Sequence, residues 1–173
     1  PENNQESPIL IQTGSISILP ETYQELYWDD GVFESSIEVE SNDSLAVKFR
    51  ASNVGQQIVR FKWYQTENGG AIKLIVWDNS QDNKPNNILF DKIITNTLAG
   101  WNELDLTNEP GFWSVNGDFW IGIKGFSTTQ PIAIDYDVGS NTSMHRTSNS
   151  EWVTINDWNL ALRVFLDCES QNI

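Results

Sequence analysis

Apolar residues alternate with polar ones along almost the whole chain, while apolar residues at helical spacing are nearly absent. The clearest run places Leu45, Val47 and Phe49 on one face, with the basic residues Lys48 and Arg50 on the other. A period of two residues puts successive side chains on opposite faces of a β-strand. Five further runs of this kind lie at 57–65, 71–78, 118–125, 131–137 and 159–167. The chain is therefore expected to be all-β, with one buried and one wetter face on each strand.

Turn residues separate these runs and set the expected architecture. Asn68-Gly69-Gly70 stands between two strong runs at hairpin spacing, and a long polar loop with Pro85 follows at 78–87. Weaker strand patterns lie at 25–29, 88–94, 101–106, 143–147 and 152–155. About ten short strands, with turns every 8–12 residues, are typical of an antiparallel β-sandwich. A jelly roll is the most natural closure at this length.

The length of 173 residues fits one domain. We expect a linker or edge segment at 1–22, a single β-sandwich module at 23–168 and a tail at 169–173. The sequence starts at Pro1 without a basic and apolar leader, so we expect a piece of a longer protein. Cys168 is the only cysteine, which excludes an internal disulfide.

The charge balance is strongly acidic. Ten Lys and Arg against 24 Asp and Glu give a formal net charge of −14. Nucleic-acid binding needs a basic surface, so this charge argues against a nucleic-acid partner and equally against anionic lipid surfaces. No stretch approaches the roughly 18 apolar residues that a membrane span needs.

Several short motifs follow one another in a set order between Tyr23 and Asp167. The first reads L-Y-W-D-D-G-V-F-E from Leu26 to Glu34, and the later ones are Val47-x-Phe49, Ile58 to Tyr64, Ile72 to Pro85, Gly100-Trp101-Asn102, Phe119 to Ile123, Ile132 to Asp135 and Leu160 to Arg163. Their order and spacing resemble the "YDDG…E" jelly-roll modules of secreted bacterial proteins, which are often attached to extracellular peptidases or to chains with a sorting signal. The resemblance implies a non-catalytic accessory domain at an extracellular or cell-surface location, similar in shape to carbohydrate-binding modules.

Residues for enzymatic chemistry are sparse. His145 is the only histidine, and the chain has no G-x-S-x-G elbow, no H-E-x-x-H and no phosphate-binding loop. We therefore expect no enzyme and no catalytic residue. A β-sandwich hydrolase that uses a carboxylate pair is an alternative, because Asp135 and Asp137 lie two residues apart on one expected strand face.

Calcium is the most plausible cofactor, as a structural ion. Asp29, Asp30 and Glu34 cluster around a glycine, and Asp135 is a further oxygen donor. Carboxylate oxygens are the ligands that Ca²⁺ prefers. A second candidate is the acidic loop 78–83, although both segments also read as ordinary polar turns.

Eight tryptophans are an unusual number for this length. Trp63 is in phase with core residues, whereas Trp77 and Trp120 are out of phase and Trp158 lies near a strand end. Exposed flat rings stack on the apolar C–H faces of sugars, so Trp77, Trp120 and Trp158 are the predicted ligand-binding residues. The alternative is that other segments of the chain cover these rings.

The sequence thus predicts a non-catalytic accessory module that binds a glycan or a cell-surface partner, next to neighbouring domains in the same chain. A purely structural spacer or stabilising domain of an extracellular peptidase is the first alternative, and the carboxylate hydrolase is the second.

Overall fold

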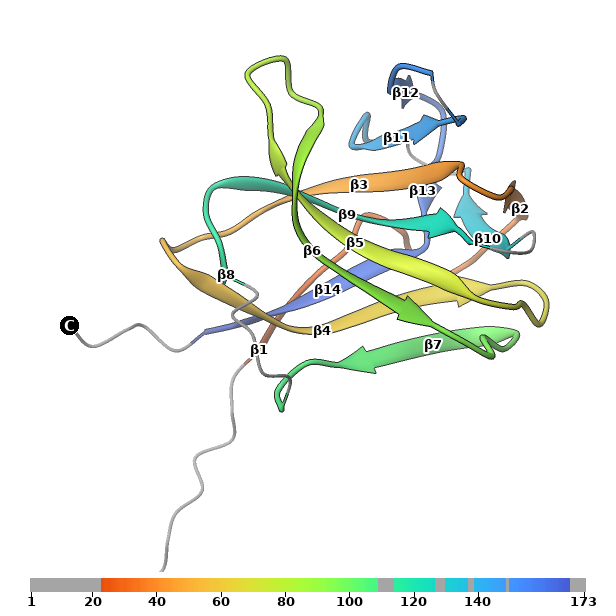
Figure 1. Ribbon diagram of the computed structural model, residues 1–173, viewed down its shortest axis with the longest axis horizontal. Helices are drawn as coiled ribbons and strands as arrows, with labels where there is room; N and C mark the ends of the chain where they lie inside the picture. The colour runs from red at the N-terminus through yellow and green to blue at the C-terminus, as the bar shows by residue number, and fades with distance from the viewer. Residues whose placement is uncertain (1–22, 109–113, 127–129, 137–138, 149, 169–173) are drawn as a thin grey trace, which may run out of the picture.

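The computed structural model describes residues 23–108, 114–126, 130–136, 139–148 and 150–168. These residues form strands and turns, with no helix, and two antiparallel sheets pack as a sandwich (Figure 1). The all-β prediction is confirmed. No helix in the described ranges is long and apolar enough to span a membrane. The linker predicted at 1–22 and the tail predicted at 169–173 lie outside the described residues.

Sheet 1 has eight strands and is built around the long strand β4. The order is β1-β14-β4-β10-β13, with β2 beside β10 and with β7 and β8 beside β4. Its strands are β1 (Tyr23–Leu26), β2 (Ser35–Val39), β4 (Gln56–Gln65), β7 (Gly100–Asp105), β8 (Ser114–Val115), β10 (Gln130–Asp135), β13 (Asn159–Leu160) and β14 (Leu162–Asp167).

Sheet 2 has six strands in the order β12-β11-β3-β9-β5-β6. Its strands are β3 (Ser44–Arg50), β5 (Ile72–Asn79), β6 (Pro85–Ile94), β9 (Asp118–Gly125), β11 (Ser143–Arg146) and β12 (Val153–Ile155). Neighbouring strands in both sheets run antiparallel. The side chains of directly paired residues therefore share a face.

The core lies between the sheets and consists of the in-phase residues of the alternating runs. Leu45, Val47 and Phe49 of β3 are buried there, as are Phe61 and Trp63 of β4. The same holds for the inward positions of the other strong strands: Ile72, Leu74, Val76, Phe119, Ile121, Ile123, Ile132, Ile134, Leu160, Leu162, Val164 and Leu166. Period-two alternation thus located the core correctly.

The hairpin predicted at Asn68–Gly70 is wrong. This turn connects β4 of sheet 1 to β5 of sheet 2, so the two strands it joins do not pair. The hairpin instead joins β5 to β6 through the polar loop 80–84, where Asn83 has a positive φ of 59° and Ser80 accepts a hydrogen bond from the Lys84 amide. Glycine and asparagine are favoured both in turns between two sheets and in hairpin turns, so the residues at 68–70 do not distinguish the two.

The outer face of sheet 2 carries a second apolar cluster, which corrects two predictions. Trp77 and Trp120 were predicted to be exposed, but they are only 2% and 1% exposed. They pack with Ala46, Ile75, Met144 and Trp152, so β11 and the segment before β12 help to cover them. Gly122 makes room for Trp77, because a Cβ at this position would lie 2.8 Å from the Trp77 ring.

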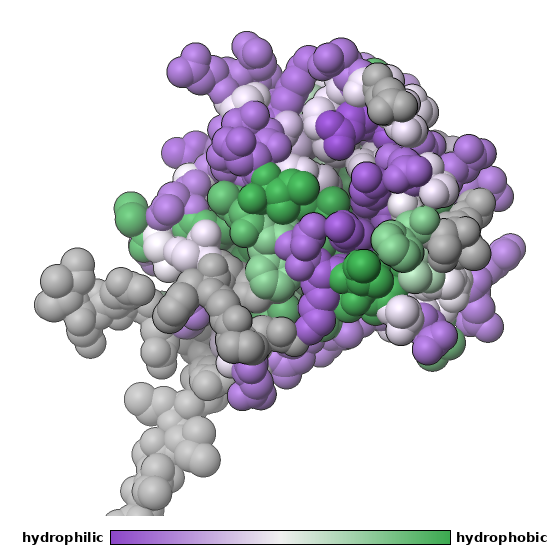
Figure 2. All heavy atoms as spheres, in the orientation of Figure 1, coloured by the Kyte–Doolittle hydropathy of each residue, from purple (hydrophilic) through white to green (hydrophobic). Residues whose placement is uncertain are grey.

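The edge strand β6 leaves apolar side chains in solvent. Ile88, Leu89 and Ile93 are exposed, whereas Phe90 and Ile94 of the same strand pack against the core. Figure 2 shows hydrophobic residues gathered along β6, between hydrophilic flanks.

Candidate binding surface

The outer face of sheet 1 presents an exposed group of rings. We call this group the aromatic face and define it as Tyr27, Phe33, Tyr64 and Trp101. Tyr64 of β4 is paired directly with Trp101 of β7, so both side chains point to the same side of the sheet. Tyr27 follows β1, and Phe33 comes from the loop before β2. Tyr27 is 51% exposed and Trp101 is 39% exposed.

The rings contact one another at angles that fix their positions. The Phe33 and Tyr64 ring centroids lie 4.7 Å apart, and those of Tyr64 and Trp101 lie 5.5 Å apart at an interplanar angle of 87°. Phe33 also meets Trp101 edge-on at 5.8 Å. Tilted and edge-to-face pairs are favoured because the electron-rich face of one ring meets the electron-poor edge of the next. The aromatic face is therefore a preformed platform.

Two cations brace this platform. The Arg163 guanidinium lies 4.7 Å from the Tyr27 ring centroid and 4.6 Å from that of Trp101. The Lys62 ammonium lies 5.0 Å from the Trp101 centroid. The register explains this arrangement, because Arg163 of β14 is paired with Lys62 of β4 and both point outward. Cation–π contacts of this length hold a ring in place while leaving part of it accessible.

Arg163 is itself held by two carboxylates. Its Nε donates to Asp29 Oδ2 at 3.2 Å, its Nη2 donates to Asp29 Oδ1, and its Nη1 donates to Glu25 Oε1 at 3.3 Å. Burial alone would lower the pKa of Arg163. The hydrogen bonds and negative charge of Asp29 and Glu25 outweigh burial, so the pKa of Arg163 is raised. The guanidinium is therefore a permanent charge beneath the rings.

The structure brings the four predicted calcium ligands into one neighbourhood, with each carboxylate already holding a donor. Asp29 is buried against Arg163 and also accepts from the Gly31 amide. Asp135 accepts from the Asp30 amide at 2.9 Å. Within the described residues, no group of three acidic, histidine or cysteine side chains is arranged to hold a metal ion. A calcium ion bound by Asp29, Asp30, Glu34 and Asp135 stays a prediction.

The two remaining acids of this group hold backbone amides. Asp30 Oδ1 accepts from the Val32 amide at 2.7 Å, and Glu34 Oε2 accepts from the Tyr136 amide at 3.0 Å. Asp135, expected on a wet strand face, is buried. The backbone at Asp30 lies against the Asp135 carboxylate and covers it. The alternating pattern carries no information about this distant segment, so it predicted the wrong exposure for Asp135. Asp137 lies outside the described residues.

Trp158 and Trp28 lie at the margin of the sandwich. Trp158 is partly buried against the core rather than standing free. Trp28 is exposed, donates from its indole Nε1 to the Lys48 carbonyl at 2.9 Å and stacks near Phe49. Neither belongs to the aromatic face.

Sequence reasoning missed most of the aromatic face, although part of the signal was present. Trp101 is out of phase with Leu104 in the sequence, and this phase places it outward. Tyr27 lies in the weak strand pattern at 25–29, which does not assign it a face, and Phe33 lies outside the alternating runs. Arg163 alternates with buried Leu162 and Val164, which shows that it points outward but not which rings it meets.

Among comparisons with known proteins, only solved structures match this chain. No protein-family model matches the chain, and a search of curated proteins gives no match. The structure of the cysteine protease and lectin-like domains of Cwp84, a surface layer associated protein of Clostridium difficile, matches with a TM-score of 0.66 at 15% identity, over 85% of this chain and 36% of that chain. A structure of the clostridial cysteine protease Cwp84 after propeptide cleavage matches with a TM-score of 0.69 at 14% identity, over 85% of this chain and 40% of that chain.

The matching part of those structures is the lectin-like domain and not the protease domain. This chain thus spans less than half the length of either structure. At such identity the likeness establishes the sandwich fold.

Proposed function

We propose that this chain is a non-catalytic accessory module of a larger extracellular or cell-surface protein, and that it binds carbohydrate through the aromatic face. The observation that carries the proposal is the exposed pair Tyr27 and Trp101, braced from below by Arg163. Such rings lose little conformational entropy when a ligand packs on them, because their neighbours already hold them. The fold shared with a lectin-like domain supports the same reading.

Charged side chains around the rings could form hydrogen bonds with the hydroxyl groups of a bound sugar. Glu103 lies opposite Lys62 in the β4–β7 register and is paired with Arg60 at 3.2 Å. These charged groups flank Trp101, whose ring would supply stacking. We propose that the rings provide affinity and that the flanking carboxylate and ammonium groups orient the sugar.

The test is a glycan array followed by calorimetry on the best ligands. Trp101→Ala is expected to weaken binding about tenfold or more, as the loss of a central aromatic contact does at other interfaces. Trp101→Phe, which keeps a ring, should lose less. Phe126→Ala removes an aromatic side chain of similar exposure outside the aromatic face and is the matched control.

The alternative function is a structural spacer that binds no glycan. An absence of binding across a broad panel of bacterial and host glycans would favour the spacer. Equal weakening by Trp101→Ala and Phe126→Ala would contradict a role for the aromatic face. The melting temperature of each variant separates lost binding from lost folding.

A further inference from the structure

A row of basic side chains crosses the outer face of sheet 2, on the opposite side of the sandwich from the aromatic face. Lys124 of β9 is paired directly with Lys73 of β5 on one side and with Ser44 of β3 on the other, and Ser44 is paired with Arg146 of β11. Directly paired residues share a face, so all four side chains project to the same side. Three of the ten bases of this acidic chain thus lie in one row.

The three bases of the row differ in their partners. Lys73 donates to Asp91 Oδ2 at 3.0 Å. Neither Lys124 nor Arg146 has a carboxylate within ion-pair distance among the described residues. The Arg146 guanidinium lies 4.6 Å from the Trp152 ring centroid, a contact that positions it without neutralising it. Like charges directly across a ladder destabilise it, so the Lys73–Lys124 pairing has a cost that an anion would relieve.

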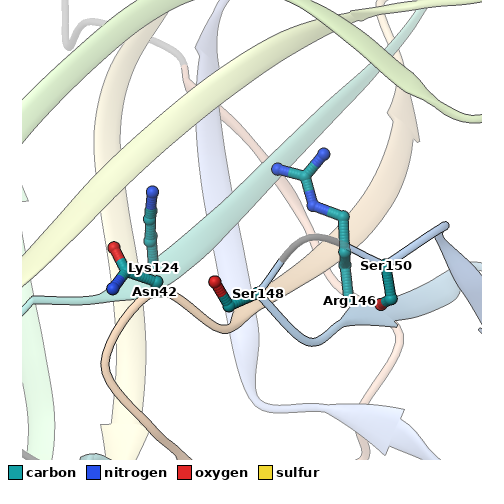
Figure 3. A pocket seen from close by; sticks show the side chains of 5 residues that line it. All are labelled: Asn42, Lys124, Arg146, Ser148 and Ser150. Carbon is teal, nitrogen blue, oxygen red and sulfur yellow. The ribbon is translucent and has the colours of Figure 1, made fainter.

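Lys124 and Arg146 line a pocket of about 290 Å³ together with Asn42, Ser148 and Ser150. Figure 3 shows the side chains of Lys124 and Arg146 projecting to the same side, with the shorter side chains of Asn42, Ser148 and Ser150 nearer the backbone. The nearby carboxylate of Asp43 is engaged, because its Oδ1 accepts a hydrogen bond from the Ser148 amide at 2.8 Å. The lining is thus rich in donors and carries two positive charges.

Ser44 provides an independent indication at the base of the row. It lies between Lys124 and Arg146 and is only 1% exposed, and its hydroxyl has no hydrogen-bond partner in the part of the chain that the structure describes. A buried hydroxyl without a partner has lost its hydrogen bonds to water without replacing them, which destabilises the folded state. A ligand or a water molecule that reached this hydroxyl would satisfy it.

We propose that this pocket binds one oxyanion, the carboxylate or phosphate group of an acidic saccharide. Arginine presents parallel N–H donors that match two oxygens of a carboxylate or phosphate, while lysine supplies a point charge. The Ser148 hydroxyl and the Asn42 amide add neutral donors, whereas the Ser150 hydroxyl already donates to the Thr147 carbonyl at 3.0 Å. The volume lies at the lower end of the range for small-molecule sites, which suits a single charged group or one sugar ring. This site is separate from the aromatic face and does not depend on it.

The test uses titrations of the isotope-labelled chain followed by NMR, with inorganic phosphate, glucuronate and neutral glucose as probes. Phosphate, glucuronate or both should shift the amides of Ser148 and Ser150, and glucose should not. The probe that binds identifies the source of the oxyanion. Lys124→Gln should weaken binding about tenfold, in line with the loss of a charge-assisted hydrogen bond. It leaves the Arg146–Trp152 contact in place, and Arg146→Gln should have a similar or larger effect.

The control is Arg50→Gln, which makes the same change in net charge at a solvent-exposed base paired with Asp118. It should leave binding within about twofold, an energy well under 1 kcal/mol. Equal weakening by Arg50→Gln and Lys124→Gln would show a general charge effect and overturn the proposal, as would the lack of binding of both anions. Trp101→Ala should keep the phosphate or glucuronate response, so failure of the aromatic face and failure of this pocket are distinguishable.

Discussion

Replacing Arg163 with methionine is expected to destabilise the sandwich by about 3 kcal/mol, because it leaves a buried carboxylate without its counter-ion. The side chain of Asp29 has no solvent exposure, and that of Arg163 is only 16% exposed. Methionine keeps much of the length and apolar character of the arginine stem, so the substitution removes mainly the charge and its hydrogen bonds.

The magnitude follows from the contacts. Removing one partner of a buried ion pair costs about 3–5 kcal/mol. The Gly31 amide still donates to Asp29 Oδ1 at 3.1 Å after the change, which places the expected cost at the lower end. The Arg163–Glu25 contact at 3.3 Å is partly exposed and adds less than about 1 kcal/mol. At roughly 2–4 °C for each kcal/mol in a domain of this size, the midpoint should fall by about 6–12 °C.

The assay is equilibrium unfolding in urea, with Arg50→Met as the control. Arg50 pairs with Asp118 at 3.3 Å, but its side chain is 79% exposed, so this variant should change stability by no more than about 0.5 kcal/mol. Asp29→Asn and the double variant complete a cycle that isolates the Arg163–Asp29 coupling. The reasoning is refuted if Arg163→Met costs no more than Arg50→Met, or if the two changes at Arg163 and Asp29 simply add.

Two further predictions concern the acidic groups. If Asp29, Asp30, Glu34 and Asp135 hold a structural calcium ion, as the sequence predicts, chelation by EDTA should lower the melting midpoint, because the ion balances four neighbouring carboxylates. An unchanged midpoint would contradict the calcium prediction and leave Arg163 and the backbone amides as the partners of these acids. The pKa of Asp105 is lowered, first by the Thr107 hydroxyl and then by the Thr107 amide, which donate to its Oδ1 at 2.6 and 2.9 Å. A folded-state pKa below the unfolded one gives stability that is present at neutral pH and is lost as the pH falls through the folded pKa. Thr107→Ala should therefore raise the pKa of Asp105 in a carboxyl NMR titration, and the stability gap to the parent should narrow in acid; an unchanged titration contradicts this.

The core could be predicted from the sequence because the strands obey one local rule. Alternation identified the inward residues of β3, β5 and β9 without knowledge of their partners. The rule failed where distant segments cover the second face of a strand. Trp77 and Trp120 are out of phase with the core, yet residues around β11 and β12 enclose them in an apolar cluster of their own. Nothing in the local pattern at 71–78 or 118–125 distinguishes a covered outer face from a wet one.

The candidate site was harder to predict, because it depends on contacts between residues far apart in the chain. Arg163 meets Asp29 across 134 residues and Glu25 across 138 residues. Alternation gives the face of Arg163 but not the register that brings it beside Trp101. The sequence shows the acids around Gly31 as a cluster of oxygen ligands. A guanidinium and backbone amides can satisfy the same carboxylate oxygens as a calcium ion, and the sequence does not distinguish the two.

The net charge of −14 bears differently on long and short anions. A nucleic acid contacts a large surface and would lie close to acidic as well as basic side chains. The net negative charge of the chain therefore disfavours its binding. A single carboxylate or phosphate at the proposed pocket responds mainly to the nearby charges, which are Lys124, Arg146 and the opposing carboxylate of Asp43, because charges beyond the Debye length of about 8 Å are largely screened at physiological ionic strength. An acidic domain of this kind would therefore disfavour polyanions and still hold one oxyanion at the proposed pocket.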